Sequence, residues 1–150
     1  MPNDIDPIIA PKILVLLTEA FENVRGYFLS PNTTFFETLE TLDHIKASRT
    51  MRDSDETIVG HIKHVILALR YSQDFLIGKD VSQYDWKASW SDAVDSEGWS
   101  SLKDELRAEY ARICEFVRNR DGWTVGNNLD VMIGTIAHCA YHLAIIRQNL

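Results

Sequence analysis

The stretch TIVGHIKHVILALRYSQDFLI, residues 57–77, repeats apolar side chains at the spacing of a helix with one buried face. That face is predicted to hold Ile58, Ile62, Val65, Leu69, Ser72 and Leu76. Gly78 follows as a stop signal, because glycine readily adopts the left-handed conformation that ends many helices. Asp53 and Glu56 precede the stretch at capping-box spacing, which predicts that they cap its start.

Three further segments carry the same helical period. The first begins near Asp6-Pro7, and its apolar face continues through Tyr27 and Phe28 to a stop at residues 30–32. Another covers about residues 101–119. The last begins after Asn127-Asn128, runs nearly to the C-terminus and has an expected buried face of Leu129, Ile133, Ile136, Ala140, Leu143 and Arg147.

Two connections are long for a compact helical protein. Residues 31–56 contain amphipathic spacing that predicts one short extra helix, at Phe35, Phe36, Leu39, Leu42 and Ile45. Residues 78–100 hold Trp86, Trp90 and Trp99, and we expect this aromatic connection to pack across an end of the helices. Four long helices without a pattern of alternating strands predict an all-α four-helix bundle, one domain over residues 1–150.

The overall charge excludes several classes of function. The chain has 15 Lys and Arg against 22 Asp and Glu, a formal net charge of -7. Binding to nucleic acid or to an anionic membrane surface needs an excess of basic residues, so neither is expected. Without a recognisable signal peptide, an obvious membrane-spanning run or a disulfide framework, the sequence favours a cytoplasmic protein.

Histidine spacing carries the functional signal. His138 and His142 are four residues apart, so they lie on one face of the last helix and can bind one metal ion. His61 and His64 lie on the helix over residues 57–77. Helix periodicity places His61 nearer the centre of the buried face and His64 on its flank, and this does not decide which of them would complete a site.

Three known metal constellations do not fit the sequence. A zincin needs glutamate directly after the first histidine, where this chain has Cys139. A ferritin-like site needs glutamate three residues before each histidine, where Thr135 and Cys139 stand. Cys114 and Cys139 are not grouped as in a structural zinc knot. A three-histidine site with open positions remains, and it suits catalytic zinc as well as nickel, iron or copper.

Two motifs resemble the DinB/YfiT-like superfamily, small four-helix bacterial proteins with a three-histidine metal site. They are TIVGHIKHVILALRY at residues 57–71 and IAHCAYHLAIIRQ at residues 136–148. The tryptophan stretch with Asp85, Trp86 and Trp90 extends the resemblance over nearly the whole chain. Ala144 departs from the pattern, because glycine is common at that position.

The resemblance implies one metal ligand from the second long helix and two from the last. In the family, six positions separate a small polar residue from the ligand that follows it; matched to Thr57, this spacing selects His64. The implied ligands are therefore His64, His138 and His142, with His61 as an additional ligand or a group supporting them. The implied cofactor is a divalent ion, zinc or nickel first and iron or manganese next.

The resemblance further implies a metal-dependent thiol transferase or hydrolase that acts on a small molecule, with a low-molecular-weight thiol as a candidate partner and a homodimer as the assembly. Trp86, Trp90, Tyr141 and Arg147 could shape its pocket; simple packing, or an ion-paired helix end for Arg147, is the competing interpretation. Two alternative functions remain open. One is a non-catalytic metal-binding or stress-response protein, and the other is a structural dimer with incidental histidines.

Overall fold

The computed structural model describes residues 6–150, and over this range the chain is all-α, as the sequence predicts. The helices are α1 (Asp6–Phe21), α2 (Phe35–Glu40), α3 (His44–Ala47), α4 (Ile58–Leu76), α5 (Ser96–Arg118) and α6 (Asn128–Gln148). Thr50 and Thr57 form an isolated β-bridge. The predicted extra helix between residues 31 and 56 is in fact two short ones, α2 and α3.

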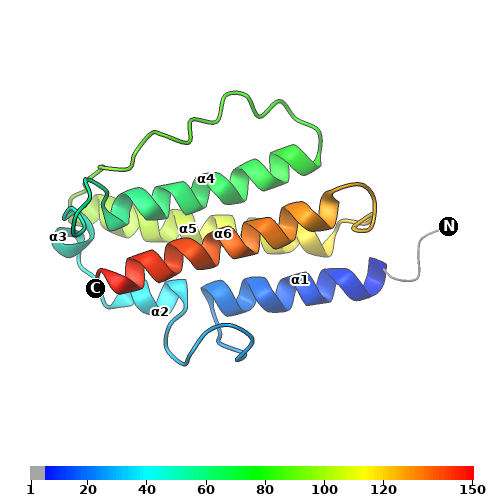
Figure 1. Cartoon of the computed structure of the whole chain (residues 1–150), viewed down its shortest axis with the longest axis horizontal. Helices are drawn as coiled ribbons and strands as arrows, with labels where there is room; N and C mark the ends of the chain where they lie inside the picture. Colours follow the sequence, from blue (N-terminus) through cyan, green and yellow to red (C-terminus); the bar gives the residue numbers. More distant parts are fainter. Residues whose placement is uncertain (1–5) are drawn as a thin grey trace.

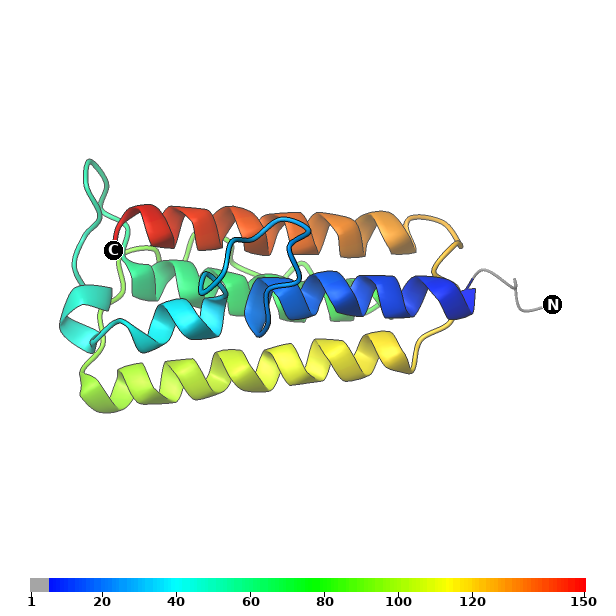
Figure 2. The same ribbon diagram turned by 90° about the horizontal axis from the view of Figure 1, so that it is seen from below.

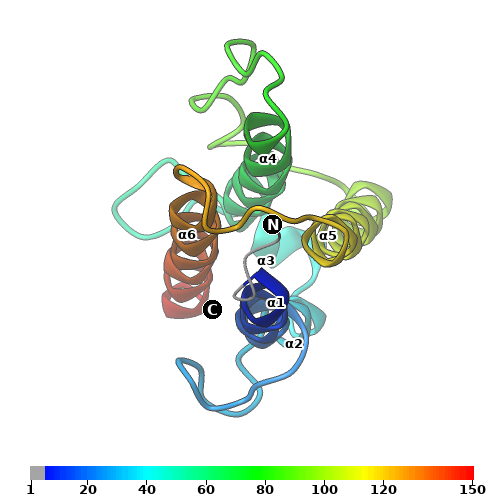
Figure 3. The same cartoon turned by 90° about the vertical axis from the view of Figure 1, so that its right-hand side faces the viewer.

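Four of these helices are long and lie side by side (Figure 1). Seen along their axes, α4 and α1 occupy opposite corners, and each contacts both α5 and α6 (Figure 3). The short helix α2 continues roughly in line with α1 (Figure 2). The inner sides of the four long helices enclose one apolar core. Its fully buried members include Leu17, Phe21, Ile62, Leu69, Leu106, Met132 and Leu143.

Helix α4 follows its sequence pattern closely, apart from its cap. All six predicted face residues are buried, and Gly78 has the left-handed φ of +76°. The predicted cap at Asp53 and Glu56 is wrong. Thr57 caps the helix instead, because its hydroxyl accepts the Gly60 N–H at 2.9 Å. Glu56 is thereby left free to bind His61.

Helix α1 ends earlier than predicted, at Phe21 rather than near residue 30. Glu19 is fully buried, and the backbone N–H groups of residues 26–29 donate to its carboxylate at 2.9–3.1 Å. Burial acts to raise the pKa of Glu19, but these four hydrogen bonds outweigh it and lower the pKa overall. The chain folds back over this carboxylate, which leaves the side chains of Tyr27 and Phe28 exposed.

Two other predicted details are corrected. Helix α5 starts five residues early, because the Asp95 side chain accepts the Gly98 N–H at 2.8 Å and caps it. The buried face of α6 is rotated from the predicted one: Ile133 is 53% exposed, whereas Met132 and Cys139 are fully buried. Apolar residues lie on several sides of α6, so contact with α1 and α4 selects the buried face.

The connection from α4 to α5 runs back along α4 instead of crossing an end, as Figure 1 shows. Helices α4 and α5 point the same way, so the chain must return the whole length of α4, about 28 Å for its 19 residues. Thr57 anchors the returning chain, since its N–H donates to the Trp90 carbonyl at 2.9 Å and its hydroxyl to the Asp92 carbonyl at 2.6 Å. The third tryptophan, Trp99, lies outside this connection, buried in α5.

Gly60 permits this close approach. A Cβ atom there would lie 2.2 Å from the Trp90 carbonyl oxygen and 2.7 Å from that of Ser89. Both are backbone atoms, which cannot swing away as a flexible side chain does. The absence of a side chain at Gly60 therefore fixes where Trp90 can sit.

We expect Gly60→Ala to lower the free energy of unfolding by about 1–3 kcal/mol, the usual cost of overpacking, because the connection must move outward. Urea unfolding measures the change. Gly134→Ala is the matched control, since its Cβ would meet nothing within 4 Å, and alanine should stabilise that helix by up to about 1 kcal/mol. Equal or higher stability of Gly60→Ala would contradict the inferred contact.

Candidate metal centre

Four histidines meet where α4 packs antiparallel to α6. His61 and His64 come from the first turns of α4, and His138 and His142 come from the C-terminal half of α6. One ring nitrogen from each of His64, His138 and His142 lies within 4.8 Å of the other two. These are the three residues that the family resemblance selects, and they form a cluster able to hold a metal ion.

The separations suit a single ion. The Nε2 atoms of His64 and His138 are 3.0 Å apart. Two imidazole nitrogens bound tetrahedrally to one zinc ion lie about 3.3 Å apart, given bonds of about 2.0–2.1 Å. The His64–His138 separation is therefore close to that of two ligands of one ion. Neutral nitrogen donors of this kind suit zinc, nickel, iron and copper.

His61 lies behind this cluster and uses both ring nitrogens. Its Nε2 is 2.9 Å from a carboxylate oxygen of Glu56, and its Nδ1 is 2.8 Å from Nδ1 of His142. The carboxylate can only accept, so the neutral His61 ring carries its proton on Nε2 and must accept at Nδ1. His142 consequently donates from Nδ1, which leaves the lone pair on its Nε2 free for a metal.

Aromatic rings border the cluster. Trp90 stacks on His64 with ring centroids 4.3 Å apart and planes 26° apart. Trp86 meets His64 edge-on at 5.4 Å, and Tyr141 meets His142 edge-on at 5.3 Å. Tyr141 is 62% exposed, which places it at the mouth of a cavity of about 320 Å³ that all four histidines line.

Arg147, the remaining pocket candidate, lies elsewhere. Its guanidinium donates to the Thr38 hydroxyl on α2 at 2.9 Å, and Arg147 does not line the histidine cavity. The sequence interpretation also missed Glu56, which it assigned to a helix cap, and Gly60. A glycine inside a helical pattern does signal a close approach of another chain segment, whereas nothing in the sequence distinguishes Glu56 from its acidic neighbours.

Burial keeps the imidazoles neutral. Desolvation, with smaller contributions from His138 and the α4 histidines, lowers the pKa of His142 to about 3. Desolvation together with the charges of His138 and His61 lowers the pKa of His64 to about 4. Burial also lowers the pKa of His138 and that of His61, the latter against the opposing effect of Glu56. Near neutral pH the cluster therefore presents lone pairs, as metal binding requires.

Comparison of the chain with protein-family models, curated proteins and solved structures finds no match. The DinB/YfiT-like resemblance accordingly rests on the two histidine motifs and the tryptophan stretch alone.

Among residues 6–150, α6 is the one helix long and apolar enough to cross a membrane, with a mean hydropathy of 1.5. The sequence analysis predicts no run of that length. Core helices of water-soluble proteins pass the same test, and this one packs against α1 and α4. The expectation of a cytoplasmic protein stays a prediction.

The metal-free protein should lose stability as the pH falls below 6.5. An unfolded histidine takes up a proton near that value, whereas folded His142 and His64 do so only at about 3 and 4. Their contribution is full above pH 6.5 and is lost on the way down to the folded pKa values, by roughly 1 kcal/mol per pH unit and histidine.

Urea unfolding in the presence of a chelator, at pH 7.5 and pH 5, measures this loss. His142→Gln should show a drop smaller by roughly 1–2 kcal/mol, whereas the control His44→Gln, outside the cluster, should keep the full drop. An identical drop in His142→Gln and the wild type would contradict the assignment.

Proposed function

We propose that this chain is a divalent-metal-dependent enzyme with a four-helix bundle of the DinB/YfiT-like type, and that it acts on a small molecule as a thiol transferase or a hydrolase. His64, His138 and His142 hold the ion. The observation that carries the proposal is the convergence of these three neutral imidazoles beside a cavity. Zinc and nickel are the first candidates for the ion, followed by iron and manganese. A cytoplasmic homodimer belongs to the same proposal.

The donor set favours catalysis over a structural role for the ion. Structural zinc usually has four protein ligands, whereas three histidines leave a coordination position for another molecule. A divalent ion held in this way supplies Lewis-acid activation of a water or a thiol near neutral pH. The cavity beside the histidines gives such a molecule access, with Tyr141 at its mouth.

Residues behind the ligands keep the site in order. Glu56 holds the Nε2 proton of His61, and His61 in turn accepts the Nδ1 proton of His142. This series of hydrogen bonds fixes the orientation of the His142 ring and makes its Nε2 more basic. The Trp90 ring covers one face of His64 and excludes water there. The two contacts together preorganise the ligands before the ion arrives.

Metal binding should stabilise the protein and should depend on the ligands. Zinc in 100-fold excess over its Kd should raise the free energy of unfolding by about 2.7 kcal/mol, because the ion binds only the folded cluster. His142→Ala should lose this effect, whereas His44→Ala should keep it. Thermal unfolding with and without zinc or nickel, together with elemental analysis of the purified protein, gives the answer. No metal and no stabilisation in the wild type would refute the proposed site.

Catalysis needs a separate measurement. Zinc- and nickel-loaded protein should turn over at least one substrate in a panel that combines low-molecular-weight thiols with electrophiles and includes hydrolysable esters and amides. His64→Ala should abolish that turnover. A metal-loaded protein that is inactive across the panel would point instead to a non-catalytic metal-binding protein.

Glu56→Ala should weaken zinc binding about 10- to 100-fold, because the orientation of His142 and its proton position are no longer fixed. Isothermal titration with zinc measures this affinity. Asp55→Ala is the matched control, since Asp55 is an exposed acidic neighbour that does not line the cavity. Equal affinities of Glu56→Ala and Asp55→Ala would show that the Glu56–His61 contact does not support the metal.

A further inference from the structure

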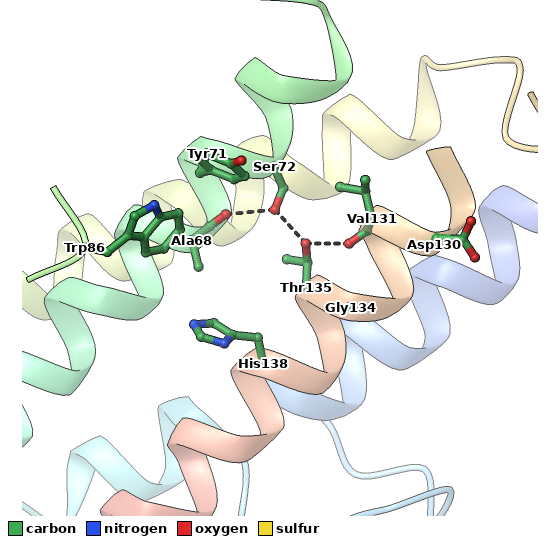
Figure 4. A pocket seen from close by; sticks show the side chains of 9 residues that line it. All are labelled: Ala68, Tyr71, Ser72, Trp86, Asp130, Val131, Gly134, Thr135 and His138. Atoms are coloured by element: carbon green, nitrogen blue, oxygen red, sulfur yellow. Dashed lines mark hydrogen bonds between the residues drawn. The ribbon is translucent and has the colours of Figure 1, made fainter. Parts of the chain in front are cut away.

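A second cavity, of about 310 Å³, opens between α4 and α6 and has His138 in common with the histidine cavity (Figure 4). We call it the groove. Its walls are formed by Ala68, Tyr71 and Ser72 of α4, Val131, Gly134 and Thr135 of α6, and Trp86 of the returning connection. The groove therefore adjoins the proposed metal site through one of its ligands.

The groove leads away from the histidines along α6. Its lining runs from His138 back to Asp130, eight residues earlier. At 1.5 Å per helical residue this corresponds to about 12 Å. A molecule whose reactive end lies at His138 can thus extend its body over Gly134 towards Asp130.

The walls favour an apolar body. Two polar side chains, Ser72 and Thr135, lie between the helices, and both are more than nine-tenths buried. Their hydroxyls are 2.5 Å from each other, and each lies 2.8 Å from a backbone carbonyl of its own helix (Figure 4). Because their hydrogen-bonding needs are already met within the protein, a polar ligand would gain little from them.

The aromatic side of the groove is held in place by ring contacts. Tyr71 meets Trp86 edge-on with centroids 4.9 Å apart, and Trp86 in turn contacts His64. The opposite side is open above Gly134, where an added Cβ would meet nothing within 4 Å. Fixed aromatic rings facing a bare helix backbone leave a slot for a slim molecule.

The far end of the groove carries a negative charge. Asp130 lines it there and is exposed. A carboxylate at the tail of a ligand would be repelled, whereas a neutral or cationic group would not.

We propose that the groove binds the apolar body of the substrate. The substrate class is a small molecule with a metal-binding group at one end, an apolar body of about 12 Å along α6, and a neutral or cationic tail at Asp130. This inference rests on the proposed metal-dependent function and adds the class of substrate.

Linear alkyl hydroxamates, from acetohydroxamate to octanohydroxamate, test the groove with the zinc-loaded protein, because their heads bind metal and their chains differ only in length. Calorimetry should show Kd falling by up to about fourfold per added methylene, the effect of burying each one. An affinity that does not change with chain length would overturn the proposal.

Gly134→Leu should fill the groove while leaving all three proposed ligand residues in place. We expect it to bind zinc and acetohydroxamate as the wild type does and to lose the gain with chain length. Ala144→Leu adds the same side chain at an exposed position of α6 outside the groove and should keep the gain. If Gly134→Leu does not fold, Val131→Phe narrows the same slot, and retention of the full gain there would equally contradict the groove.

The tail is tested with octanohydroxamates that end in an amine or a carboxylate. The wild type should bind the amine a few-fold more tightly, and Asp130→Asn should reduce that preference. A preference unchanged in Asp130→Asn would remove Asp130 from the proposal.

The outcomes separate the two proposals. Failure of the wild type to bind zinc overturns the metal-dependent function. Binding of zinc and acetohydroxamate without any gain from longer chains overturns the groove alone.

Discussion

Four imidazole rings gather where α4 packs on α6. Because most of them are buried, the residues around them must satisfy the hydrogen-bonding groups of the rings. A buried polar nitrogen without a hydrogen-bond partner is costly, so each ring needs a neighbour. The structure provides them within the cluster, in the His64–His138 and His61–His142 contacts, and through Glu56 at its edge. The position of Trp90 depends on Gly60, because its ring covers His64 only where Gly60 lets the backbone come close.

The sequence predicts the helices better than their surroundings. The sequence of α4 is amphipathic, so the repeat of its apolar residues predicts both the extent of the helix and its buried face. Helix α6 is apolar on several sides, and its buried face becomes clear only once α1 and α4 pack against it. Sequence periodicity could not predict the early end of α1. The helix ends because the Glu19 carboxylate accepts hydrogen bonds from backbone N–H groups that follow it. A single buried carboxylate thus outweighs an apolar repeat that would otherwise extend to Phe28.

The histidine cluster was predictable from the sequence, whereas the residues that support it were not. Helical spacing places His138 and His142 together, and the family resemblance chooses His64 where periodicity leaves His61 open. In the structure both α4 histidines join the cluster, His64 among the three grouped nitrogens and His61 behind His142. Glu56 lies at the edge of the cluster because Thr57, and not Glu56, caps α4. Their spacing in the sequence does not show which of the two residues forms the cap.

The parallel course of α4 and α5 has a consequence for the order of folding. His64 and His138 are 74 positions apart in the chain, with the returning connection and the whole of α5 between them. Contacts so distant in sequence form after local ones, since the loop between them must first be closed. A complete cluster can therefore exist only in a chain in which α4 and α6 have already packed together. An ion bound there would stabilise molecules in which these two helices are packed and not less folded ones, because only the packed molecules present the complete cluster.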